Sequence, residues 1–307
     1  MQPSKILLFG EYTILLNSYA LAIPFNMFDG ELSFMDASGD KKSGEAYRSN
    51  QRLKEFFTFS RQSDINQRLT FPLDFESFEK DLENGLHFKS DIPEGSGIGS
   101  SGALVAAIFD KYSDIRPRDN DILKIKNCLA ELESYYHGNS SGIDPLVSYL
   151  KTPILIEENQ ISLTFLPGIE KVLQDFGLFL VYSQDKGNTG ELVNKFNSKC
   201  LSDSEYINKI HQEYIPVNNE CIISLAKTRN AERFFSAIRN LTLLQLEIFN
   251  EMIPEKIIQM INYGVEKNMF YLKLCGSGGG GFFLGFTKKI TQTKSYFNER
   301  GYRILVY

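Results

Sequence analysis

The chain has 307 residues, which is enough for one large domain or two of ordinary size, and we expect two. Hydrophobic residues make up 42% and charged residues 23%, as in a typical soluble globular protein, so a disordered or collagen-like chain is excluded. The formal net charge of −5 provides no broad cationic surface, so we expect no nucleic-acid partner.

Residues 5–25 form an apolar run that ends near Ala20-Leu21-Ala22 and imitates a secretory signal. Glu11 and Asn17 interrupt it, and no other stretch approaches the ~20 apolar residues of a membrane span. The four cysteines are far apart without a C-x-x-C pair, which indicates neither a zinc site nor a disulfide framework. We therefore expect a cytoplasmic protein with no membrane partner, and leave open whether it forms a homodimer.

The first half of the chain reads as strands with a few helices. We predict strands at 5–9 and 31–36, a loop at 38–44, a helix near 46–60, a polar and aromatic-rich connection, and an extended segment at 86–92. After Gly99, Ser100-Ser101 is predicted to cap a helix with core positions Val105, Ile108, Phe109 and Tyr112. A second helix is predicted over about 119–136, with Asp119 or Asn120 as its cap and a stripe of Ile122, Ile125, Leu129, Leu132 and Tyr136.

The second half begins with two short strands, at 153–156 and 161–165, followed by Pro167-Gly168, where we place the domain boundary. Beyond it we predict a buried strand at 177–182 and several helices between 189 and 267. Strands at 270–274 and 282–286, a helix near 291–299 and a strand at 302–306 close the chain. No internal repeat is evident.

Three glycine-punctuated stretches stand out: KILLFGEYTILL at 5–16, PEGSGIGSSGA at 93–103 and KLCGSGGGGFFLGF at 273–286. In the middle stretch an extended segment enters a glycine turn that opens onto a helix, so unpaired N–H groups of the first helical turn face the loop. This arrangement suits a phosphate. It matches neither a Walker loop nor the dinucleotide fingerprint, and a plain turn that starts a helix is the alternative.

The glycines at 276–281 lie between apolar, strand-like flanks, which favours a tight turn over a linker. Asp144 follows the second helix at the edge of a glycine-containing turn, where an aspartate is most often a capping residue. Glu133 lies on the shoulder of the apolar stripe, so its carboxylate needs a partner such as a cation.

With these three motifs in order, the chain resembles the GHMP small-molecule kinases, and within them most closely the mevalonate kinases. The segment ESYYHGNSSGID at 133–144 resembles the mevalonate kinase stretch with a magnesium-binding glutamate and a catalytic aspartate. The resemblance implies an α+β fold with an N-terminal domain like ribosomal protein S5 domain 2 at 1–168 and a ferredoxin-like domain at 169–307. It places the active site in the interdomain cleft.

The resemblance also implies the site residues and the substrates, ATP with Mg²⁺. Asp144 would be the base and Lys5 its catalytic companion, and Glu133 with Ser100 or Ser101 would bind the metal. The nucleotide would be bound by Pro93, Gly95, Ser96, Gly97, Ile98, Gly99, Ser100, Ser101, Gly278 and Gly279. The acceptor would be bound by Lys5, Glu11, Tyr12, His137, Ser141, Asp144, Thr189 and Gly278.

The expected reaction is transfer of the γ-phosphoryl group to the primary hydroxyl of mevalonate, which gives 5-phosphomevalonate and ADP. The sequence departs from the family pattern at Tyr12, where a histidine is usual, at Ser140, where a proline is usual, and at Cys275. Tyr12 keeps open a sister kinase that acts on phosphomevalonate, homoserine or a sugar. A non-catalytic nucleotide-binding homologue is a further alternative, and the motifs fit mevalonate diphosphate decarboxylase less well.

Overall fold

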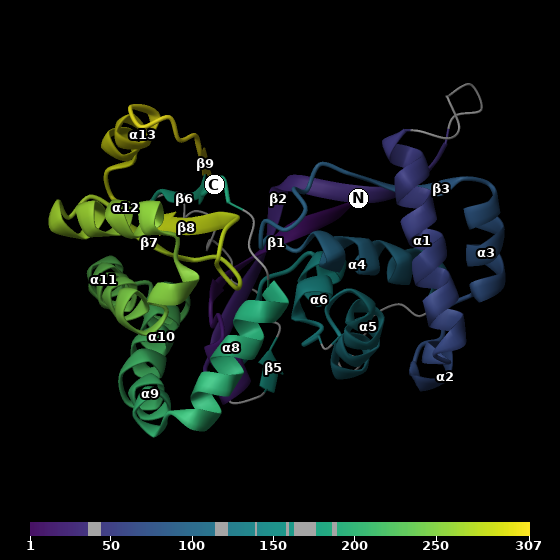
Figure 1. Cartoon of the computed structure of the whole chain (residues 1–307), viewed down its shortest axis with the longest axis horizontal. Helices are drawn as coiled ribbons and strands as arrows, with labels where there is room; N and C mark the ends of the chain where they lie inside the picture. The colour runs from purple at the N-terminus through teal and green to yellow at the C-terminus, as the bar shows by residue number, and fades with distance from the viewer. Residues whose placement is uncertain (36–43, 114–121, 139, 158–159, 163–175, 186–188) are drawn as a thin grey trace. The chain divides into compact units, whose positions relative to one another are not determined.

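The structure is a computed structural model that describes residues 1–35, 44–113, 122–138, 140–157, 160–162, 176–185 and 189–307 (Figure 1). The side chains of residues 137, 160–162, 189 and 190 are outside this description. The chain divides into two compact units: unit 1 comprises Met1–Lys5, Ile23–Pro93 and Gly99–Thr152, and unit 2 comprises Ile6–Ala22, Glu94–Ile98 and Pro153–Tyr307. The boundary predicted at Pro167-Gly168 lies outside the described residues and stays a prediction.

Unit 1 consists mainly of helices around a strand pair. Strands β1 (Gln2–Phe9) and β2 (Ala20–Phe34) each contribute residues to both units. The other elements of unit 1 are α1 (Glu45–Gln62), α2 (Ile65–Arg68), α3 (Phe75–Glu83), β3 (Leu86–Ser90), α4 (Ser100–Tyr112), α5 (Ile122–His137) and α6 (Ile143–Leu150). Antiparallel β3 pairs with Gly30–Phe34 of β2, and α4 packs against both α5 and α6.

The two helices α4 and α5 confirm the apolar spacing read from the sequence. Seven of the predicted core positions are buried: Val105, Ile108, Phe109, Tyr112, Ile125, Leu129 and Leu132. The two end positions of the predicted α5 stripe, Ile122 and Tyr136, are only partly buried. The predicted caps Asp119 and Asn120 lie outside the described residues. The predicted serine cap of α4 is wrong, because Gly99 is the N-cap, with φ 83°, and no side chain caps this helix. Ser101 instead donates its hydroxyl proton to Glu133.

Helix α3 occupies part of what the sequence suggested was a polar connection. Asp74 caps it by accepting a hydrogen bond of 3.0 Å from the backbone N–H of Ser77. Phe78 and Leu82, four residues apart, turn the apolar face of the helix into the core of unit 1. Helix α1 confirms the prediction for 46–60.

Strand β2 begins much earlier than predicted, since the strand expected at 31–36 overlaps only its last residues, 31–34. Residues 20–25 are buried at every position, so they lack the alternation that marks a half-exposed strand. In unit 2, Ala20–Ala22 pairs antiparallel with β4 (Ile154–Glu157), which pairs with β5 (Gln160–Ser162). The two short strands predicted here are therefore present, although 163–165 lies outside the described residues.

Unit 2 is built on a second sheet with helices packed against it. Its strands are β6 (Leu178–Tyr182), β7 (Tyr271–Leu274), β8 (Phe282–Phe286) and β9 (Ile304–Val306). Its helices are η1 (Thr13–Leu16), α8 (Thr189–Ser202), α9 (Ser204–Lys209), η3 (Ile210–Tyr214), α10 (Ile215–Ile222), η4 (Ile223–Lys227), α11 (Ala231–Ile248), η5 (Asn250–Met252), α12 (Glu255–Glu266) and α13 (Ile290–Asn298). Helices α11 and α12 pack against β7.

The strand order of this sheet is β7-β8-β6-β9, and each neighbouring pair is antiparallel. Read along the chain, β6, a helical region, β7, β8, α13 and β9 form a β-α-β-β-α-β arrangement, which is the ferredoxin-like motif (Figure 1). The sheet positions the glycine-rich turn 275–281, because that turn connects the adjacent strands β7 and β8. No described helix is long and apolar enough to cross a membrane.

Candidate active site

A lysine and an aspartate predicted as catalytic partners contact each other in unit 1. Lys5 Nζ lies 2.9 Å from Asp144 Oδ2, and the two side chains are 4% and 35% exposed. Lys5 comes from β1, and Asp144 lies in the first turn of α6. The lysine is therefore buried, while the aspartate is open to solvent on one side. Asp144 does not cap α6, because that position belongs to Gly142.

Glycines bring this pair close to helix α4. A Cβ atom at Gly102 would lie 2.9 Å from the carbonyl carbon of Asp144, so a larger residue would push α4 and α6 apart. A Cβ at Gly99 would lie 2.8 Å from Cγ of Lys5, and Gly99 has φ 83° besides. The start of α4 therefore lies directly beside Lys5 and Asp144.

Glu133 of α5 supplies a second, buried carboxylate beside the first. Its Oε1 accepts a hydrogen bond of 3.2 Å from the Ser101 hydroxyl, and its Oε2 accepts one from the Ser140 hydroxyl. Burial, followed by the negative charge of Asp144, raises the pKa of Glu133 to about 7. The hydrogen bond from Ser140 and the charge of Lys5 act in the opposite direction. The site thus holds two carboxylates, one buried and one partly exposed.

The oxygen-rich surroundings of Glu133 fit a Mg²⁺ ion. A carboxylate at the boundary of the core with hydroxyl neighbours is a hard-oxygen donor set. The described residues contain no group of three or more His, Cys, Asp or Glu side chains suited to a metal. Mg²⁺ usually keeps several waters and substrate oxygens in addition to one or two protein carboxylates. Of the two serines predicted as ligands, Ser101 is the one in contact with Glu133.

The second glycine motif meets the third within unit 2. Backbone N–H of Phe282 donates to the carbonyl of Ser96 over 3.1 Å. A Cβ at Gly97, where φ is 84°, would lie 2.3 Å from the carbonyl oxygen of Cys275, so only glycine permits this approach. Both predicted tight turns, around 95–99 and 276–281, are therefore present, and the two backbones lie against each other.

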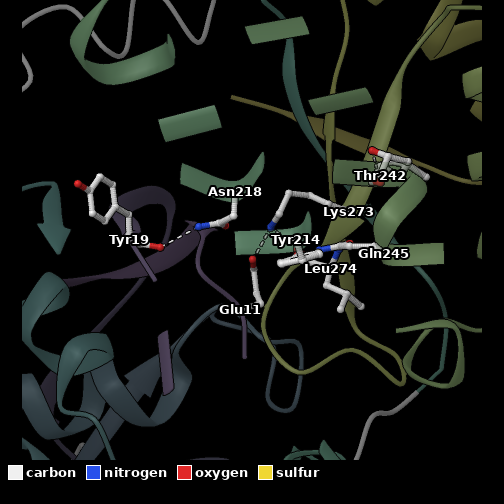
Figure 2. A network of polar contacts seen from close by, with 9 residues as sticks. Glu11, Tyr19, Tyr214, Asn218, Thr242, Gln245, Lys273 and Leu274 are labelled. Atoms are coloured by element: carbon white, nitrogen blue, oxygen red, sulfur yellow. Dashed lines mark hydrogen bonds and ion pairs between the residues drawn. The ribbon is translucent and has the colours of Figure 1, made fainter. Parts of the chain in front are cut away.

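The first motif meets the third through side chains. Glu11, 2% exposed, forms an ion pair with Lys273 of β7, and both side chains are buried (Figure 2). The Tyr12 hydroxyl donates to the carbonyl of Ser277, and its ring packs 4.8 Å from Phe196 between centroids. The phenol at the position where the family pattern has histidine is thus part of a packed cluster.

A polar network extends from Lys273 into the helices behind β7. Lys273 Nζ also donates to the carbonyl of Leu274 over 2.5 Å, and the backbone N–H of Leu274 donates to Gln245 Oε1 over 2.9 Å. The Gln245 side chain donates in turn to the Tyr214 hydroxyl over 2.8 Å (Figure 2). The last two residues of β7, Lys273 and Leu274, are therefore held by side chains of Glu11 and Gln245.

The other predicted residues are placed as follows. Gly278 and Gly279 lie against Met252: a Cβ at Gly278 would be 2.5 Å from its carbonyl oxygen, to which Gly279 N–H donates over 2.7 Å. The Ser141 hydroxyl accepts a bond of 3.3 Å from the Ile143 N–H. The side chains of His137 and Thr189 lie outside the described residues. The loop and helix start described above contain the remaining predicted residues, Pro93, Gly95, Ile98 and Ser100.

Sequence reasoning missed two polar residues of these clusters, Ser140 and Lys273. Ser140 was noted only as a departure from the family pattern. Lys273 carried a usable signal, because it is a single lysine in the apolar run before the glycine turn, as Glu11 is a single acid in the apolar run 5–16. Two single, opposite charges in buried, apolar segments need partners, so the sequence could have suggested that Glu11 and Lys273 pair with each other.

Comparison with known proteins supports the resemblance. Residues 70–152 match the family described as GHMP kinases N terminal domain. A mevalonate kinase of Archaeoglobus fulgidus is 24% identical over 292 residues, and the match covers 93% of this chain and 91% of the relative. Cys128, Cys200, Cys221 and Cys275 are free cysteines.

Two solved structures show the same fold. The mevalonate kinase of Methanococcus jannaschii has a TM-score of 0.66 at 19% identity, covering 99% of this chain and 96% of that one. An L. major mevalonate kinase in complex with R-mevalonate has a TM-score of 0.69 at 15% identity, covering 100% and 94%. The expected mixed α and β fold is confirmed, and the expected enzyme class, a small-molecule kinase, agrees with these relatives. The chain is therefore similar to the GHMP kinases, as its three motifs predicted, and mevalonate kinases are among the proteins that it resembles.

Proposed function

We propose that this protein is an ATP-dependent kinase that phosphorylates the primary hydroxyl of mevalonate to give 5-phosphomevalonate and ADP. The observation that carries the proposal is the contact between Lys5 and Asp144 next to the buried Glu133 carboxylate and the start of α4. The similarity to mevalonate kinases over nine-tenths of the chain supports the choice of acceptor.

Phosphoryl transfer needs alignment and neutralisation of charge more than covalent chemistry by the protein. In the proposed reaction the acceptor oxygen forms a bond to the γ-phosphorus, the bond to the β–γ bridging oxygen breaks, and ADP leaves with that electron pair. The hydroxyl proton passes to a carboxylate oxygen of Asp144, whose other role is to orient the hydroxyl. Lys5 holds that carboxylate at Oδ2 and carries positive charge near the transferred group.

The nucleotide phosphates would lie at the glycine-rich loop and the first turn of α4, where Gly95, Gly97 and Gly99 have positive φ. The N-terminus of a helix attracts anions such as phosphate. Glu133, with a hydroxyl from Ser101 or Ser100, would hold Mg²⁺. When bound, this ion neutralises charge on phosphate oxygens. A cytoplasmic location, as expected from the sequence, is part of the proposal.

A kinase of the same superfamily with another acceptor is the second candidate, and Tyr12 favours it. In this chain the phenol at the position of the usual histidine donates to Ser277 and packs against Phe196. The Tyr12 side chain therefore differs in shape and in hydrogen-bonding pattern from an imidazole at the same position. Phosphomevalonate, homoserine and a sugar are the acceptors to compare.

A coupled assay of ADP release with mevalonate, phosphomevalonate, homoserine and galactose tests the proposal. We expect the highest kcat/KM with mevalonate, and none with any acceptor when Mg²⁺ is removed by a chelator. A higher kcat/KM with another acceptor would replace mevalonate by that compound. Nucleotide binding measured by calorimetry without ADP release on any acceptor would instead indicate a non-catalytic homologue.

A further inference from the structure

The Ser140 hydroxyl connects Glu133 with the turn that begins α6. It donates to Oε2 of Glu133 and accepts a hydrogen bond of 3.0 Å from the backbone N–H of Gly142. Gly142 is the N-cap of α6, and Asp144 lies two residues further on. One hydroxyl thus joins the buried carboxylate of α5 to the chain segment that carries the partly exposed one.

The direction of these hydrogen bonds is set by the chemistry of the groups. A serine hydroxyl has one proton and two lone pairs, and the Gly142 N–H can only donate. A lone pair of Ser140 Oγ is therefore occupied by Gly142, which leaves the hydroxyl proton for Glu133. With Ser101 donating to Oε1 and Ser140 to Oε2, both oxygens of the carboxylate have a partner.

The hydroxyls of Ser101 and Ser140 would have different roles when a metal ion is bound. Ser101 lies at the start of α4 and is itself a predicted metal ligand, so its oxygen would turn to the ion. Ser140 remains as a donor to the carboxylate, on the side of the α5–α6 turn. Carboxylates that bind metals are oriented by hydrogen bonds of this kind, and their loss weakens metal affinity.

We propose that Ser140 is a positioning residue that fixes the orientation of the Glu133 carboxylate for Mg²⁺ and ties it to the turn that carries Asp144. The inference rests on the proposed function, because it takes Glu133 as the metal ligand. Ser140 itself contacts no substrate in this role and acts only through Glu133.

The test compares Ser140→Thr with Ser140→Val, which have nearly the same shape and differ in the hydroxyl. Affinity for Mn²⁺ in the presence of ADP is measured by electron paramagnetic resonance, which needs no turnover, and kinase activity is titrated with Mg²⁺. We expect Ser140→Val to weaken Mn²⁺ affinity about tenfold and to raise the half-saturating Mg²⁺ similarly. Ser140→Thr should restore both values to near those of the unmodified protein.

Ser134→Ala is the matched control, because the Ser134 hydroxyl follows Glu133 on α5 but donates to the carbonyl of Glu131. Equal Mn²⁺ affinities of Ser140→Thr and Ser140→Val would overturn the proposal, whether both variants bind like the unmodified protein or both bind more weakly. If Ser140→Val alone weakens Mn²⁺ binding while no acceptor is phosphorylated, the role of Ser140 stands and the proposed function fails. If mevalonate is phosphorylated and the two variants bind Mn²⁺ alike, only the role of Ser140 fails.

Discussion

Glu133 and Asp144 are the same kind of acid in different surroundings. Glu133 is 3% exposed and held by two hydroxyls, whereas the Asp144 side chain is 35% exposed and contacts an ammonium group. A carboxylate that is open on one side can reach a substrate hydroxyl, while a buried carboxylate with fixed orientation suits a cation. Their surroundings therefore favour the base role for Asp144 and the metal role for Glu133.

Asp144→Asn removes the proposed proton acceptor and keeps the size of the side chain. We expect kcat to fall by about 10²–10⁴, the usual contribution of a positioned general base, while the affinity for a non-hydrolysable ATP analogue changes little. Single-turnover kinetics and calorimetry measure the two quantities. Asp110→Asn, at an exposed position of α4, is the control and should keep full activity. A kcat near that of the unmodified protein would remove Asp144 from the mechanism.

The proposed role of Glu133 as a magnesium ligand predicts that the magnesium requirement depends on pH. Its pKa is raised to about 7, so the protonated form dominates below pH 7 and the ionised form above it. Because Mg²⁺ binds the ionised carboxylate, the half-saturating Mg²⁺ should rise up to about tenfold for each pH unit below 7 and level off above pH 8. The groups that face Glu133 are Asp144, which raises its pKa, and Lys5, which lowers it.

Titration of activity with Mg²⁺ at pH 6, 7 and 8 checks this expectation, after correction for the Mg²⁺–ATP equilibrium in each buffer. Glu133→Gln is the comparison variant, which should need more Mg²⁺ at every pH and lose the pH dependence between 6 and 8. The same half-saturating value at pH 6 and pH 8 in the unmodified protein would contradict the assignment of Glu133.

At the scale of elements, the buried ion pair of Glu11 and Lys273 joins the turn after β1 to strand β7 (Figure 2). Removing one partner leaves a charge without its counter-ion in the core of unit 2. We expect Lys273→Met to lower the free energy of unfolding by about 3–5 kcal/mol. The double variant Glu11→Gln/Lys273→Met should lose less than the sum of the two single changes, since neither charge is then left alone.

Urea unfolding followed by circular dichroism measures these differences. The control is Glu79→Gln, whose partner Arg61 is exposed, and which should cost at most about 1 kcal/mol. If the two single losses at Glu11 and Lys273 simply add, the ion pair does not couple the turn to β7.

Gly97 and Gly95 form a natural pair for testing the contact between the second and third motifs. Both have positive φ, but an added Cβ meets the Cys275 carbonyl at 2.3 Å for Gly97 and nothing described within 4 Å for Gly95. Gly95→Ala should cost about 1–2 kcal/mol of backbone strain alone, and Gly97→Ala should cost clearly more. Thermal unfolding measures the stability of the two variants. Equal losses of stability would mean that the backbone at Cys275 moves away from the added Cβ without a measurable energetic cost.

The sequence predicted what depends on local pattern. The stripes of α4 and α5, the two glycine turns and the strands of the second sheet follow from spacing and from flanking residues, and the structure contains them. Helix α3 was missed, although the sequence contains two signals for it: Asp74 as a capping residue and the four-residue spacing of Phe78 and Leu82. The first half of β2 was missed because a strand buried on both faces has no alternation. The contacts of Ser140 depend on the path of a turn, which no periodicity specifies.

At the scale of the whole molecule, the two units are interleaved along the chain. Six alternating segments make them up, and unit 2 takes the short segments Ile6–Ala22 and Glu94–Ile98 from the first half of the sequence. The first of these carries Glu11 and also Phe9, whose ring stacks on that of Phe286 with centroids 5.8 Å apart. The core of unit 2 thus depends on residues far from its strands in sequence.

Dividing the chain at the predicted boundary tests this dependence. Fragment 169–307 holds Lys273 and Phe286 but lacks Glu11 and Phe9, so its core would contain an ammonium group without its carboxylate. We expect it to show no cooperative thermal transition alone and to gain one when fragment 1–168 is added, as measured by near-ultraviolet circular dichroism of its tyrosines. Lys273→Met in the fragment should recover part of the structure, because the lone buried charge is then gone. A cooperative transition of the unmodified fragment by itself would show that the segment before residue 23 contributes little to the stability of unit 2.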